Sequence, residues 1–291
     1  MGLLRAQKKS REHLAAVGSL WTRIIYLKDE ALTIPRIYSP YALENKTTCE
    51  LGPDNLKYLK QVMRLKHGDK INIFDGFGCE FEAVIKSYST KTVFIELGKI
   101  IPTADKKIRI TLAQAIPKAG KMDTIVKSAA ELGADVIIPF DAARSVGRIA
   151  DEKISLKVAR WQKIAGEAAR SSHSSHITKV SKVSSFTDMI ALASGDALRL
   201  IFWEEESQKT IKDILKDKTI TATKDIFIVI GPEGGFSKDE VTMAKEAGFI
   251  SVSLGKQILK VETAAATILS IIQYEKGIFG HKSQEIKNDH L

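Results

Sequence analysis

After residue 107 the sequence alternates between short apolar runs and longer amphipathic runs. This alternation constrains the fold more strongly than any other feature of the sequence. Val136–Phe140 and Ile226–Ile230 are apolar along their whole length, which is typical of strands buried on both faces of a parallel sheet. Lys121–Leu132 has helical spacing of its apolar residues, and Gly133 follows as a stop. Strands that alternate with helices predict an α/β fold, a parallel sheet with helices on both faces.

The expected elements of this part are given by residue range. We expect strands at 108–112, 136–140, 200–203, 226–230 and 252–254, and helices at 121–132, 156–169, 237–247 and 262–274.

The preceding residues have a different pattern, of short β-rich runs separated by polar turns. Runs at 71–74, 80–85 and 92–97 favour strands, and the spacing at 55–64 favours one helix. We therefore expect a small N-terminal β-barrel or sandwich. A length of 291 residues suggests about two domains. The expected boundaries are 1–34 for an N-terminal extension, 35–103 for the barrel, 104–276 for the α/β domain and 277–291 for a polar tail.

Composition narrows the function classes. The 44 Lys and Arg against 35 Asp and Glu leave a net charge of +9, which favours a polyanionic partner.

No run of 18 uninterrupted apolar residues exists, so we expect no membrane-spanning helix. Cys49 and Cys79 each stand alone, so we expect no disulfide framework and no Cys-rich metal site. The basic residues before the apolar patch 14–21 lack a cleavage pattern, and we expect a cytoplasmic protein.

The most informative local pattern is Gly231-Pro-Glu-Gly-Gly-Phe236, directly after the most apolar strand. Ser237 and Glu240 then have the spacing of a capping box, which marks a helix start. Glycines let backbone amides approach a ligand closely at the carboxyl end of a strand. The loop is neither a Walker motif nor Gly-x-Gly-x-x-Gly, and Glu233 would repel an anion. A plain glycine turn is the alternative interpretation.

A second irregular loop begins at Leu254-Gly255, runs through 256–260, and leads into a helix opened by 261–264. Two such loops after adjacent strands predict one crevice with two walls. The alternative is an ordinary connection with Glu262 favourably placed in the first helical turn.

Together, GPEGGFSKDE at 231–240 and LGKQILKVETAAA at 254–266 resemble the carboxyl-terminal signature of the RsmE family. These are SPOUT-class methyltransferases that methylate N3 of a uridine in 16S ribosomal RNA. Weaker matches occur in order at 36–38, 62–64, 68–69, 74–76, 113–118, 121–122, 127–128, 131–133 and 161–164. The resemblance covers about 240 residues, from Arg36 to about Tyr274.

The resemblance implies a PUA-like barrel, a SPOUT domain whose C-terminal chain forms a trefoil knot, and a homodimer through the knotted region. It implies S-adenosylmethionine (AdoMet) as cofactor and 16S rRNA or the 30S subunit as partner, with no metal and no membrane. The implied cofactor-binding residues are Trp203, Glu204, Ile230, Gly231, Gly234, Gly235, Leu254, Gly255, Ile258, Leu259 and Thr263.

Methylation of uracil N3 needs removal of a weakly acidic proton and alignment of the resulting anion with a methyl group, so positioning and anion stabilisation should dominate. We expect cations near the base to stabilise the anion, with Lys260, Arg36 and Arg64 as candidates, and Glu233 or Glu262 to orient them or accept the proton. The expected RNA-binding residues are Arg36, Arg64, Lys118, Lys121, Arg144 and Arg148. For Arg64 the alternative is a cation that complements the end of a helix.

Some positions depart from the family pattern. Gln257 and Lys260 stand where arginines are usual, Val261 stands where threonine is usual, and 170–176 differs from the usual polar stretch. A non-catalytic RNA-binding or ribosome-assembly protein with the same fold therefore stays an alternative. A dinucleotide-dependent oxidoreductase would share the alternation of strands and helices, but this sequence lacks the glycine-rich motif with which such enzymes bind phosphate. His173 and His176 lack a third metal ligand nearby in the sequence.

Overall fold

The computed structural model describes residues 34–103, 106–118, 120–147, 149–193, 195–217 and 223–279. These residues form two compact units. The smaller unit comprises the described residues up to Ile37 with Thr47–Ile73 and Glu82–Lys99, and the larger unit comprises the rest. The expected extension 1–34 and tail 277–291 fall almost wholly outside the described residues.

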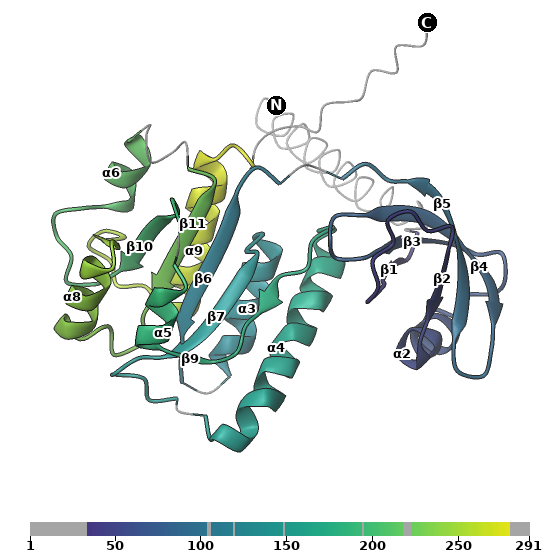
Figure 1. Ribbon diagram of the computed structural model, residues 1–291, viewed down its shortest axis with the longest axis horizontal. Helices are drawn as coiled ribbons and strands as arrows, with labels where there is room; N and C mark the ends of the chain where they lie inside the picture. The colour runs from purple at the N-terminus through teal and green to yellow at the C-terminus, as the bar shows by residue number, and fades with distance from the viewer. Residues whose placement is uncertain are drawn as a thin grey trace, which may run out of the picture. The chain divides into compact units, whose positions relative to one another are not determined.

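The N-terminal part contains a five-stranded sheet (Figure 1). Its strands are β1 (Arg36–Tyr38), β2 (Thr48–Leu51), β3 (Lys70–Phe74), β4 (Glu80–Tyr88) and β5 (Val93–Ile100), in the order β1-β3-β4-β5-β2. Burial alternates along β5, where Val93 and Ile95 are buried while Phe94 and Glu96 are exposed. This period of two is the sign of a sheet with one face on a core. The three strands predicted in this region are confirmed.

The single helix predicted at 55–64 is wrong in its second half. The chain forms a short α-helix, α2 (Pro53–Lys57), followed by a π-helical turn, η1 (Tyr58–Val62). The Met63 amide donates to the Tyr58 carbonyl five residues back, at 2.9 Å. A wider turn breaks the α-helical spacing, so Met63 is exposed while Leu59 is buried.

The larger unit is built on a parallel sheet, as predicted. Its strands are β6 (Arg109–Ala115), β7 (Val136–Asp141), β8 (Lys179–Val180), β10 (Leu198–Phe202), β11 (Asp225–Ile230) and β12 (Ile250–Val252), in the order β12-β10-β11-β6-β7-β8. The short β9 (Ser184–Ser185) also pairs with β7. Every one of these pairings is parallel.

Helices cover both faces of this sheet (Figure 1), which confirms the predicted architecture. One face carries α3 (Lys121–Glu131), α4 (Asp151–Ser171), α6 (Ile211–Lys216) and α9 (Val261–Glu275), and the other carries α5 (Phe186–Ala191) and α8 (Lys238–Glu246). Alternate residues of β11 point to opposite cores: Ile228 packs with the first set and Val229 with the second.

The predicted strands and helices of this unit are all present, with ends shifted by at most five residues. The largest shift is at α4, which begins at Asp151 instead of residue 156. Acidic Asp151 and Glu152 occupy its first turn, where the positive end of the helix dipole favours them.

Strand order corrects one expectation about the site. The strands before the two irregular loops, β11 and β12, are not neighbours, because β10 lies between them. Since all three strands are parallel, the loops after them emerge at the same edge of the sheet. No helix in the described ranges is long and apolar enough to cross a membrane.

Candidate active site

A crevice of about 960 Å³ lies at the carboxyl ends of β10, β11 and β12. The loop that follows each strand supplies one part of its lining, and Lys121 at the start of α3 completes it. Ten of the eleven residues predicted to bind a cofactor line this crevice. The eleventh, Thr263, is exposed in the first turn of α9 and is not part of the lining.

The glycine-rich loop between β11 and α8 is held firmly at its end. The capping box predicted there is present: Ser237 Oγ accepts from the Glu240 amide at 3.2 Å, and Glu240 Oε2 accepts from the Ser237 amide at 2.9 Å. The other carboxylate oxygen of Glu240 accepts from the Ala143 amide at 2.8 Å. The start of α8 is therefore tied to the segment that leaves β7.

Two glycines of this loop lie where a side chain would crowd a neighbour, Gly235 more severely than Gly231. Gly235 has φ of 67°, in the left-handed region, and a Cβ there would overlap the carboxylate of Glu204. A Cβ on Gly231 would lie 3.1 Å from the ring of Phe236. Only glycine allows both the backbone conformation and the close approach of Glu204.

Three charged side chains form a cluster at the edge of the crevice. Lys121 Nζ donates to Glu233 Oε1 at 2.9 Å and lies 3.8 Å from Glu262 Oε2. The backbone amide of Lys118 also donates to both Glu233 oxygens, at 3.2 Å. Burial by itself would raise the pKa of Glu233, but the hydrogen bonds from Lys121 and Lys118 outweigh it and lower the pKa.

The same cluster raises the pKa of Lys121, chiefly through its hydrogen bond to Glu233. Both partners therefore stay charged at neutral pH. The structure thus brings together the two carboxylates predicted to be catalytic, around a lysine predicted to bind RNA. The third predicted catalytic residue, Lys260, is exposed, precedes the first turn of α9 and lines the crevice.

The loop after β10 provides the polar groups on another side. Glu206 Oε2 accepts a hydrogen bond from the Ser251 hydroxyl, and this bond is the main reason that the pKa of Glu206 is lowered. Trp203 Nε1 is buried and has no acceptor among the described residues, while Lys245 lies over the indole ring. A carboxylate together with the apolar walls suits a flat ligand that carries positive charge.

Sequence reasoning missed four polar lining residues in and beside this loop: Glu206, Ser207, Thr210 and Ser253. A signal was present, because Thr210 and Asp213 form a capping box of the same kind as Ser237 and Glu240. The pattern lies at the start of α6, a helix too short to be recognised by periodicity.

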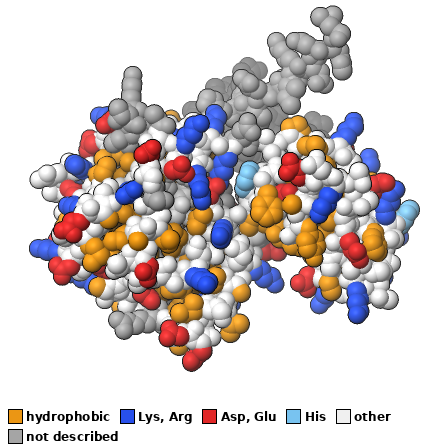
Figure 2. Space-filling view, in the orientation of Figure 1, with side chains coloured by type: hydrophobic (Ala, Val, Ile, Leu, Met, Phe, Trp, Pro, Cys, Tyr) orange, Lys and Arg blue, Asp and Glu red, His pale blue; other side chains and the backbone are white. Residues whose placement is uncertain are grey.

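The predicted RNA-binding residues are scattered. Arg144 Nη1 donates to the Gly234 carbonyl at 3.2 Å, so Arg144 lies against the glycine-rich loop. Lys118 and Arg64 are exposed, whereas Arg36 is 6% exposed. Arg148 lies outside the described residues. Figure 2 shows Lys and Arg side chains scattered among Asp and Glu over the visible face.

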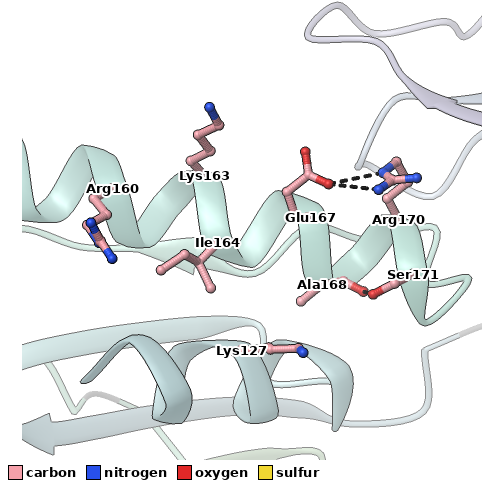
Figure 3. Close-up of a pocket in the computed structure, with 8 residues that line it drawn as sticks. All are labelled: Lys127, Arg160, Lys163, Ile164, Glu167, Ala168, Arg170 and Ser171. Carbon is pink, nitrogen blue, oxygen red and sulfur yellow. Dashed lines mark hydrogen bonds and ion pairs between the residues drawn. The ribbon is translucent and has the colours of Figure 1, made fainter. Parts of the chain in front are cut away.

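A second hollow, of about 530 Å³, lies between α3 and α4 (Figure 3). It is lined by four cations, Lys127, Arg160, Lys163 and Arg170. Arg170 donates twice to Glu167, and Arg160 donates twice to Asp123. Carboxylates of the same helices thus already engage both guanidinium groups, which makes this hollow a weaker candidate than the crevice.

No cluster of His, Cys, Asp and Glu that could hold a metal ion occurs within the described part of the chain. His176 is half-buried, and desolvation lowers its pKa.

Comparisons with known proteins agree with this geometry. An RNA methyltransferase domain model matches residues 104–273, and an RNA methyltransferase PUA domain model matches residues 51–98. Ribosomal RNA small subunit methyltransferase E of Bacillus subtilis is 32% identical over 241 residues, which cover 80% of this chain and 92% of the relative. The protein of that name from Rickettsia conorii is 30% identical, with 86% and 98% covered.

Solved structures extend the match to the fold. A methyltransferase from Legionella pneumophila, in complex with AdoMet, has a TM-score of 0.74 at 30% identity and covers 84% of this chain and 98% of its own. A ribosomal RNA small subunit methyltransferase E from Neisseria gonorrhoeae, also bound to AdoMet, has a TM-score of 0.73 at 28% identity, with 82% and 97% covered. The chain therefore belongs to the RNA methyltransferase family that contains ribosomal RNA small subunit methyltransferase E, with a PUA domain and a SPOUT-class α/β domain.

Proposed function

We propose that this chain is an AdoMet-dependent methyltransferase that methylates N3 of a uridine in 16S rRNA, on the assembled 30S subunit. The observation that carries the proposal is the crevice at the ends of β10, β11 and β12, which is lined by ten of the residues that the sequence pointed to as a cofactor site. Relatives that cover most of the chain were solved with AdoMet bound.

The residues of the crevice fit that cofactor. AdoMet combines a flat adenine with a sulfonium and an ammonium group. Backbone groups of Gly231–Gly235 and apolar Leu254 would hold the adenine, and the carboxylate of Glu206 offers negative charge. When bound, AdoMet supplies the electrophilic methyl group.

The chain's own residues would then handle the uracil. We assign Lys260, at the crevice, to stabilise the anion that forms when N3 loses its proton. Glu262 is not part of the crevice lining, and its Oε2 lies 3.8 Å from Lys121 Nζ, so we assign Glu262 to orient that cation. Glu233 would act with Lys121 to hold this region. Lys118 and Arg144 lie beside the glycine-rich loop, where they would contact the RNA.

We also propose a C-terminal trefoil knot, a homodimer through the knotted region, a cytoplasmic location, and domain boundaries at 35–103 and 104–276. Support for the knot comes from strand order, since β11 lies between β10 and β6 while the next strand, β12, lies on the far side of β10. Light scattering at twice the chain mass would support the dimer, and a monomer at micromolar concentration would contradict it.

The function is tested by transfer of tritium from labelled AdoMet to 30S subunits and to free 16S rRNA, followed by mapping of the modified base. We expect incorporation at one uridine, with 30S subunits the better substrate. A protein that only binds RNA would shift the mobility of the RNA without incorporating label. A methylated base other than uridine would overturn the substrate while leaving the fold intact.

A further inference from the structure

Lys121 is in an electrostatically unfavourable place for a cation. It is the first residue of α3, directly after Gly120, which caps the helix without a side chain. The amino end of a helix carries partial positive charge and disfavours a lysine there. The side chain is also only partly exposed, with 33% of its surface accessible. Both observations indicate that groups outside α3 hold the ammonium in place.

The partners of Lys121 come from two other elements that border the crevice. Glu233 belongs to the glycine-rich loop after β11, and Glu262 belongs to the first turn of α9. Glu262 Oε2 receives no hydrogen bond in the described structure, so the ammonium is the compensating charge near it. One cation therefore connects the starts of α3 and α9 and the glycine-rich loop, and it lines the crevice itself.

We propose that Lys121 is a positioning residue of the methyl-transfer site, which holds the glycine-rich loop and the start of α9 at the separation that the cofactor requires. This inference rests on the proposed function. Without the ammonium, the carboxylates of Glu233 and Glu262 have no counter-ion between them, and their like charges repel. Repulsion would move the two segments apart before any cofactor arrives. The role is thus distinct from a direct contact with RNA phosphate.

Three full-length variants test the proposal. Lys121→Met removes the charge but keeps the aliphatic length, and Lys121→Arg keeps a cation and can restore both pairs. Lys127→Met is the matched control. It removes the same charge from the same helix, but Lys127 is mostly exposed and lies 4.0 Å from Glu131, away from the crevice lining.

Calorimetry with AdoMet is the main measurement. We expect Lys121→Met to bind AdoMet about tenfold more weakly, Lys127→Met to bind it within about twofold of the wild type, and Lys121→Arg to recover most of the loss. Binding of 16S rRNA should change little in either methionine variant, because the proposal gives neither lysine a phosphate contact. Normal AdoMet affinity in Lys121→Met, with a selective loss of RNA binding, would overturn the proposal. A wild-type protein that does not bind AdoMet would instead overturn the proposed function.

A double-mutant cycle separates positioning from a general loss of stability. If Lys121 acts through Glu233, the variant K121M/E233Q should bind AdoMet no more weakly than K121M, because the repelling charge is gone as well. Simple addition of the two single losses would show that the pair is not a unit. If Lys121→Met does not fold, the other two variants still test the proposal. We then expect both K121M/E233Q and Lys121→Arg to bind AdoMet, and failure of both to bind it would contradict the proposal.

Discussion

The two walls of the crevice are built differently. The glycine-rich wall, 231–236, is fixed by hydrogen bonds in its middle and directly after its end: the Lys118 amide donates to Glu233, and the capping box of Ser237 fixes the start of α8. The opposite wall, 254–260, is largely exposed, and Ile258 has 88% of its surface accessible. No side chain from 256 to 259 makes a hydrogen bond or an ion pair with a described residue.

This difference indicates that the two walls contribute to ligand binding in different ways. A wall that is rigid before binding costs no conformational entropy when the ligand arrives, whereas an exposed wall can adapt to the ligand but must be ordered by it. Changes in the glycine-rich wall should therefore reduce stability and binding together. Changes in the opposite wall should reduce binding alone.

The largest effect is expected from Gly235→Ala. The added methyl group meets the Glu204 carboxylate, and the left-handed backbone is strained for alanine. We expect the free energy of unfolding to fall by about 2 kcal/mol or more and AdoMet affinity to fall by about a hundredfold. Urea denaturation followed by circular dichroism, and calorimetry, measure the two effects.

Glycines elsewhere provide the controls. Gly255 has φ of 108° in the opposite wall, but no atom lies within 4 Å of its Cβ position, so Gly255→Ala adds strain without a clash. Gly166 lies within α4 in open space, and Gly166→Ala should stabilise the protein by about 0.5–1 kcal/mol. If Gly255→Ala destabilised the protein as much as Gly235→Ala, the two walls would be equally rigid and the comparison would fail.

A smaller effect on stability is expected from Ser237→Ala. It removes the hydroxyl that accepts from the Glu240 amide, at a cost of about 1 kcal/mol. Because α8 begins where the glycine-rich wall ends, AdoMet affinity should also fall. Ser185→Ala removes the equivalent cap of α5, where Ser185 accepts from the Asp188 amide. It should cost similar stability without changing AdoMet affinity, and an equal loss of affinity in both variants would contradict the special role of the first cap.

The sequence predicted the rigid wall well because its determinants are local. An apolar strand, a six-residue loop with three glycines, and a serine with a glutamate three residues later all lie within 15 residues of sequence. The same applies to the alternating strands and helices of the parallel sheet. These features depend on backbone conformation and on hydrogen bonds between near neighbours, which the order of residues specifies directly.

Features that depend on distant packing were not predicted. The position of β10 between β11 and β12 follows from how whole strands pair. The π-helical turn at Tyr58–Val62 overrides an apolar spacing that favoured an α-helix. The ion pairs of Lys121 were not predicted, because its two carboxylate partners lie more than 100 positions away in the chain. The spacing of residues along the sequence does not predict contacts between residues so far apart in the chain.

The exposed wall is tested by Ile258→Ser. Because the side chain is 88% exposed, the free energy of unfolding should change by less than about 0.5 kcal/mol. If the loop closes over bound cofactor, loss of this apolar contact should weaken AdoMet binding by about threefold. Leu156→Ser is the control, since Leu156 is 71% exposed on α4 and is not part of the crevice lining. Loss of stability in Ile258→Ser would show that this wall is already packed without ligand.

The smallest effect is the pH dependence that the rigid wall alone should show. Residues 254–260 contain no acidic side chain, whereas Glu233 in the rigid wall has a pKa held below its ordinary value of 4.5. A carboxylate whose pKa is lowered by folding stabilises the protein above that ordinary value, and the stabilisation is lost as the pH falls through the folded pKa. In Glu233→Gln, stability should therefore decline less steeply below pH 4.5, by a few tenths of a kcal/mol because the group is partly exposed. In Lys121→Met the hydrogen bond that lowers the pKa of Glu233 is gone, so its pKa should rise toward or past the ordinary value, and the stability that its charge contributes above pH 4.5 should shrink or change sign. Urea denaturation between pH 3 and 6 distinguishes these outcomes, and identical profiles for Glu233→Gln and the wild type would mean that Glu233 does not stabilise the rigid wall through its charge.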